Sequence, residues 1–67
     1  MKFSDQVKYV RMKLELSQES LAKELGVSYS TVSRWERENR DPQMAMLGKF
    51  YNFCEKKEIY FEADKNQ

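Results

Sequence analysis

The chain has 67 residues, which is enough for one compact domain and too few for two. It contains one cysteine and no histidine, so it can form neither an intramolecular disulfide nor a Cys/His zinc site. Its formal net charge is only +1, so any binding to nucleic acid would depend on where the basic side chains gather.

Nothing in the sequence indicates export or membrane insertion. The start of the chain is too polar to be a signal peptide. No apolar run approaches the ~20 residues that are needed to span a bilayer. We therefore expect a soluble, cytoplasmic protein, with no cofactor and no bound metal ion.

Four segments carry apolar residues at helical spacing, so an all-α fold is predicted. A residue suited to N-capping, whose side-chain oxygen can accept a hydrogen bond from a free N–H of the first turn, marks the start of each segment. Gly26 follows the second segment, where a helix commonly ends in the left-handed conformation that a Cβ disfavours. The predicted helices cover residues 4–15, 17–25, 28–37 and 42–57, with Ser4, Ser17, Ser28 and Asp41 as their N-caps.

The end of the chain differs from the helical segments. Ile59, Tyr60 and Phe61 form a short run of residues that favour β-structure. We therefore expect a domain over residues 1–57, followed by a tail over residues 58–67 that includes a candidate strand.

Residues 18–35, QESLAKELGVSYSTVSRW, have the pattern expected of two short helices that cross steeply over a tight turn. Ala22 is small enough to let the helices approach, and Gly26 suits the turn. Apolar side chains that would fill the seam stand before, within and after the turn: Leu21, Leu25, Val27, Val32 and Trp35.

The second helix of this pair has a polar outer face. When Val32 and Trp35 point inward, a step of about 100° per residue turns a set of polar and basic side chains outward. This outward set consists of Ser30, Ser33, Arg34 and Arg37, with Tyr29 at the exposed edge of the first turn.

The stretch from Leu16 to Pro42 closely resembles the lambda-repressor/Cro family of helix-turn-helix proteins, the XRE family. The matching motifs are SQESLA, LGVS and STVSRWE, followed by a proline six residues after the glutamate. The resemblance implies a compact four- to five-helix domain of bacterial or phage origin. It also implies a non-enzymatic regulator, most often a repressor, that binds a palindromic operator in double-stranded DNA as a homodimer.

The resemblance also assigns roles to individual residues. In relatives, residues at the start and on the outer face of the second motif helix contact base edges. Among the matching residues here, Arg34 has the chemistry to donate two hydrogen bonds to one guanine. The predicted base contacts are Tyr29, Ser30, Ser33 and Arg34. Gln18 and Arg40 match positions that contact phosphates in relatives, and such contacts set register without reading sequence. The further predicted phosphate contacts are Ser17 and Ser28, at helix N-termini, and Arg37, for which a free surface position is the alternative.

Arg11 and Glu36 stand at the borders of the apolar faces of their helices. In several relatives the matching arginine and glutamate form a pair, so a structural ion pair is expected here. Such a pair would connect the first predicted helix to the end of the third, which carries the predicted base contacts.

The fourth segment and the tail together carry more apolar side chains than a small core needs. One interpretation is that the tail packs over the fourth helix within a monomer. The interpretation that we favour is a homodimer interface, because exposed apolar patches commonly mark interfaces. The candidate interface residues are Met46, Phe53, Ile59, Tyr60 and Phe61.

Two other classes of function fit the sequence less well. A protein-interaction module on the same scaffold, such as an antitoxin or adaptor, would present a mainly apolar outer face, whereas the face around Arg34 is polar. An enzyme is disfavoured because the sequence has no histidine, no phosphate-binding loop and no recognisable nucleophile–base pair. No small-molecule substrate is therefore expected.

Overall fold

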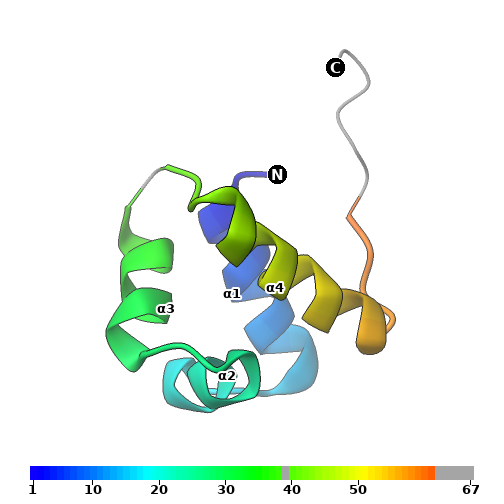
Figure 1. The fold of residues 1–67 in the computed structure, drawn as a ribbon. Coiled ribbons are helices and arrows are strands. Elements are labelled where there is room, and N and C mark those ends of the chain that lie inside the picture. Colours follow the sequence, from blue (N-terminus) through cyan, green and yellow to red (C-terminus); the bar gives the residue numbers. More distant parts are fainter. Residues whose placement is uncertain (39, 62–67) are drawn as a thin grey trace.

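The computed structural model describes residues 1–38 and 40–61. Four helices follow one another along this part of the chain, and it contains no strand, which confirms the all-α prediction. Figure 1 shows α3 at one edge of the domain, with α2 near its start and with α4 drawn in front of α1. The helices are α1 (Phe3–Leu14), α2 (Gln18–Leu25), α3 (Tyr29–Arg37) and α4 (Met44–Lys56).

The two middle helices begin and end where the sequence predicts. The hydroxyl of Ser17 accepts a hydrogen bond from the N–H of Ser20 at 3.0 Å, and the hydroxyl of Ser28 accepts one from the N–H of Thr31 at 3.2 Å. Gly26 ends α2 with a φ of 71°, the left-handed conformation that glycine adopts without strain.

The predicted start of α1 was wrong, because the N-cap lies two residues before Ser4. The helix begins at Phe3, so Ser4 lies inside it, and Lys2 in the N-cap position makes no side-chain capping bond. Phe3 is 6% exposed, and its ring packs edge-on against those of Trp35 and Phe50 at centroid distances of 5.3 and 5.0 Å. Aromatic packing therefore fixes the start of α1 in place of a cap.

The start of α4 was also predicted wrongly. The helix begins at Met44, two residues after Pro42, and its N-cap is Gln43 rather than Asp41. Gln43 is extended, with φ −64° and ψ 160°, and its carbonyl accepts the first hydrogen bonds of the helix from Met46 and Leu47. Pro42 and Gln43 therefore belong to the segment that leads into α4, and not to the helix itself (Figure 1).

All four helices contribute to one core. The fully buried side chains include Val7 and Val10 from α1, Leu21 from α2, Val32 from α3 and Phe50 from α4.

Cys54 belongs to the same core and is 1% exposed. Burial raises the pKa of its thiol to about 11, so the group is un-ionised at neutral pH and packs as a small apolar side chain.

The segment after α4 folds back onto its own domain. The chain reverses at Glu58, whose φ is 60°, and the N–H of Ile59 then donates to the carbonyl of Cys54 at 2.8 Å. Ile59 is 7% exposed as a result, and the ring of Phe61 packs against that of Tyr9 at 5.8 Å.

This return corrects part of the tail prediction. Residues 59–61 form no strand, and residues 62–67 lie outside the described part of the chain. Phe53 and Ile59 belong to the monomer core, so the expectation that they form an exposed apolar patch was wrong. Met46 and Phe61 are half-buried, whereas Tyr60 is 72% exposed.

No helix in the described residues has both the length and the apolar character that crossing a membrane would require.

The two glycines offer a matched test of this backbone. Gly26→Ala should destabilise the domain by about 1 kcal/mol, because its φ of 71° is strained for a residue with a Cβ. Gly48→Ala should stabilise it by about 0.5–1 kcal/mol, because the position is helical and no neighbouring atom lies within 4 Å of an added Cβ. Urea denaturation of both variants measures the difference. A Gly26→Ala variant as stable as wild type, or more stable, would contradict this assignment of Gly26.

Candidate nucleic-acid interface

The outer face of α3 presents polar and basic groups. Val32 and Trp35 are buried, which turns the opposite side of the helix to solvent. Tyr29 is 55% exposed at the start of that face. Of the other residues predicted on this helix, Ser30, Arg34 and Arg37 are exposed and Ser33 is half-buried.

Three hydroxyl groups gather at the start of α3. The Ser28 hydroxyl lies 2.8 Å from that of Thr31 and 3.1 Å from that of Ser30. Thr31 was not predicted as a site residue, although its position three residues after the cap would have indicated this contact. The cluster supplies hydroxyl groups that can act as donors or acceptors beside the free N–H groups of the helix N-terminus.

The serine at the start of α2 has a similar arrangement. The Ser17 hydroxyl caps the helix by accepting from the N–H of Ser20, and it donates a hydrogen bond to the Ser20 hydroxyl at 3.0 Å. Ser17 is exposed, so the N-terminus of α2 is open to solvent.

Gln18 is held by a partner that the sequence did not reveal. Its Nε2 donates to Oε1 of Glu36 at 3.0 Å, and the side chain is half-buried. One of its two amide N–H groups is used in this bond, so at most one remains for a phosphate oxygen.

Arg11 and Glu36 form a two-point ion pair. Nε of Arg11 donates to Oε2 of Glu36 at 2.6 Å, and an Nη of Arg11 donates to Oε1 at 3.0 Å. The other Nη donates to the carbonyl of Leu16 at 3.1 Å. The pair and the Gln18 bond together connect α1, the start of α2 and the end of α3.

The charge of Glu36 is stabilised despite its burial. The side chain is only 6% exposed, and burial by itself would raise its pKa. Hydrogen bonds from Arg11 and Gln18, together with the positive charges of Arg11 and Lys8, outweigh that effect, so the pKa of Glu36 lies below its usual value. The hydrogen bond to Glu36 likewise raises the pKa of Arg11.

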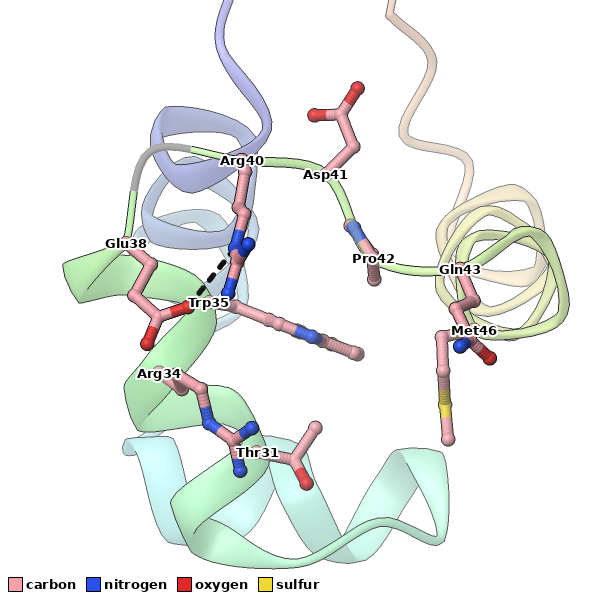
Figure 2. A pocket seen from close by; sticks show the side chains of 9 residues that line it. All are labelled: Thr31, Arg34, Trp35, Glu38, Arg40, Asp41, Pro42, Gln43 and Met46. Carbon is pink, nitrogen blue, oxygen red and sulfur yellow. Dashed lines mark ion pairs between the residues drawn. The ribbon is translucent and has the colours of Figure 1, made fainter.

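A hollow of about 460 Å³ lies between α3 and the segment that leads into α4. Figure 2 shows Trp35 between the two walls, Arg34 and Thr31 on the α3 side, and Gln43 and Met46 on the other. The hollow therefore places Arg34, a predicted base contact, close to the loop that follows α3.

Arg40, a predicted phosphate contact, lines the same hollow. Its side chain is 82% exposed, and its Nε lies 3.7 Å from Oε1 of Glu38. The structure thus gives Arg40 a carboxylate neighbour that the sequence analysis did not assign to it.

The described residues offer donors for a polyanion and no metal centre. Within residues 1–38 and 40–61, no three His, Cys, Asp or Glu side chains are placed to hold a metal ion. The exposed groups on α3 are hydroxyl, phenol and guanidinium groups, which suit phosphate oxygens and base edges.

Two short helices joined by a glycine turn, with a polar outer face on the second, define a helix-turn-helix domain. A family model described as helix-turn-helix matches residues 7–61. The chain belongs to this family, the XRE-type helix-turn-helix proteins that include lambda repressor and Cro, and domains of this family bind DNA in transcription regulators. No curated protein and no solved structure matches the chain.

Breaking the ion pair from one side should cost more than removing it whole. Arg11→Met leaves the buried Glu36 carboxylate without its counter-ion and should destabilise the domain by about 1–3 kcal/mol. The double variant Arg11→Met/Glu36→Met leaves no uncompensated charge and should recover part of that loss. Chemical denaturation of the single and double variants measures this. A double variant less stable than Arg11→Met would refute the account.

The same pair predicts a pH dependence. Because the pKa of Glu36 is lower in the folded than in the unfolded state, its contribution is fully present above the unfolded value of about 4.3. That contribution is lost as the pH falls through the folded value. Wild type should therefore lose more stability on acidification than Glu36→Gln, which cannot titrate at this position. Thermal unfolding of both proteins at neutral and acidic pH measures it, and equal losses would count against the assignment.

Proposed function

We propose that this protein is a sequence-specific transcriptional repressor that binds a palindromic operator as a homodimer, with α3 in the major groove. The observation that carries the proposal is the exposed outer face of α3, on which Arg34 stands beside Tyr29 and Ser30. Membership of a DNA-binding helix-turn-helix family supports it. We place the protein in the cytoplasm, where it acts without a cofactor or a small-molecule substrate.

Arg34 is the main base contact in this proposal. A guanidinium can donate two parallel hydrogen bonds to O6 and N7 of guanine, which is worth about 1–3 kcal/mol of discrimination. Tyr29, Ser30 and the half-buried Ser33 supply the neighbouring contacts. The ion pair between Glu36 and Arg11 ties the end of α3 to α1. A helix held in this way can position its side chains for contacts to bases, which supports the proposal.

Phosphate contacts surround the reading face. Arg37 and Arg40 contribute positive charge, and Gln18 contributes its remaining amide N–H. Ser17 and Ser28 add contacts at the exposed N-termini of α2 and α3, where free N–H groups favour an anion. These contacts position the protein and carry no sequence information.

Two copies related by a two-fold axis would present their α3 helices about 34 Å apart, one turn of DNA. With Phe53 and Ile59 in the monomer core, the contact between copies uses Tyr60 together with the half-buried Met46 and Phe61. Bound over a promoter, such a dimer represses by occupying the site that polymerase needs.

Selection of binding sites from random duplex DNA, with Arg34→Ala and Arg37→Ala in parallel, tests the proposal. Wild type should enrich a palindrome. Arg34→Ala should lose preference at one base pair of each half-site, because the two guanine contacts are gone. Arg37→Ala should weaken binding to all sequences alike. It should also reduce the slope of log affinity against log salt concentration by about one, as expected for a phosphate contact.

The other outcomes are equally informative. Enrichment that is unchanged in Arg34→Ala would refute the assignment of this residue. No enrichment at all would favour a domain whose main partner is another protein.

A further inference from the structure

Arg40 faces a carboxylate in the free protein. Its Nε lies 3.7 Å from Oε1 of Glu38, and the two side chains are 82% and 44% exposed. Figure 2 shows the two side chains close together at the α3 side of the hollow, with the dashed line joining them. On the function proposed above, Arg40 contacts a DNA phosphate, so a bound phosphate and Glu38 would compete for the same guanidinium.

The backbone at the end of α3 explains why Glu38 is placed to compete. Its N–H still donates to the carbonyl of Arg34 at 2.8 Å, which keeps the residue against the last turn. Its φ of −94° and ψ of 145° are extended, so the chain leaves the helix at this point. The carboxylate thus lies just beyond the reading helix, on the path of the loop that carries Arg40.

Asp41 provides a contrast within the same hollow. It is adjacent to Arg40 in sequence, but its carboxylate points away from Arg40 in Figure 2. The two acids therefore add the same charge to this region, while only Glu38 is directed at the arginine.

We propose that Glu38 is a built-in competitor for the DNA backbone, which pairs with Arg40 in the free protein and is displaced when a phosphate takes its place. This inference rests on the proposed function. An exposed pair of this kind changes an equilibrium constant by a factor of about 1.4 to 5, so phosphate displaces it readily but at a cost. The cost falls on every duplex alike. It keeps binding to bulk DNA weak, so that occupancy depends on the base contacts of α3.

The competition also has a signature in salt. Binding of Arg40 to phosphate releases a cation from DNA, whereas the freed Glu38 carboxylate attracts one. Removing the Glu38 carboxylate should therefore make the slope of log affinity against log salt concentration steeper, by less than about one unit. A side chain that acts only by shaping the loop would not change this slope.

The test is a double-mutant cycle on DNA affinity. Glu38→Gln, Arg40→Ala and their double variant are titrated with a fluorescent 20-base-pair duplex of random sequence over a series of KCl concentrations. Asp41→Asn is the matched control, because it removes one negative charge from the same hollow without removing the partner of Arg40. Circular dichroism checks that each variant is folded.

We expect Glu38→Gln to bind about two- to five-fold more tightly than wild type at low salt, with the gain shrinking as salt screens the pair. The gain should vanish in the Arg40→Ala background, and Asp41→Asn should give a smaller effect. Equal gains from Glu38→Gln and Asp41→Asn, or a gain that persists without Arg40, would overturn the inference. So would unchanged affinity in Glu38→Gln.

Failure of the proposed function gives a different result. Wild type could bind the random duplex and yet enrich no sequence in the selection experiment. That result would refute the proposed sequence-specific function, while the competition between Glu38 and phosphate would stand. If wild type binds no duplex, both the proposed function and this inference fail.

Discussion

The position of α3 depends on the hydrogen bonds that converge on Glu36. Its side chain is 6% exposed and receives Arg11 from α1 at 2.6 and 3.0 Å and Gln18 from α2 at 3.0 Å. A carboxylate buried to this extent is stable only when it is paired and hydrogen-bonded, so these partners hold the end of α3 against α1 and α2. Helix α3 is therefore held at its C-terminal end by this ion pair and along its inner face by Val32 and Trp35.

The parts of the fold that the sequence predicted correctly are those with local causes. Ser17, Gly26 and Ser28 each set a helix end through their own side chain or their own backbone conformation, and α2 and α3 accordingly begin and end as expected. The start of α1 and the packing of residues 59–61 on the domain depend on contacts with residues far away in the sequence. Phe3 is drawn into a core that other helices build, and Ile59 returns to that core through a reversal at Glu58, a residue type that does not favour positive φ.

The candidate site divides in the same way. The periodicity of α3 was enough to predict that Arg34 is exposed and Trp35 is buried, because a helix fixes the directions of its own side chains. The hydrogen bond between Gln18 and Glu36 and the contact between Glu38 and Arg40 were not predicted. The first joins residues from two helices, and the second depends on the path of a loop. Neither follows from the spacing of residues along one element.

The nearly balanced charge of the chain is consistent with a DNA-binding function once its arrangement is considered. The net charge is +1, but the Glu36 carboxylate is paired with Arg11 on the inner side of α3. Arg34 remains on the exposed face of the same helix. On our proposal, Glu38 further reduces the cationic charge that the free protein offers to any duplex. A single copy would then hold DNA weakly through few phosphate contacts. In the proposed dimer, two copies on a palindrome would use the same side chains twice, so binding would be tight only at sites where both α3 helices contact their bases.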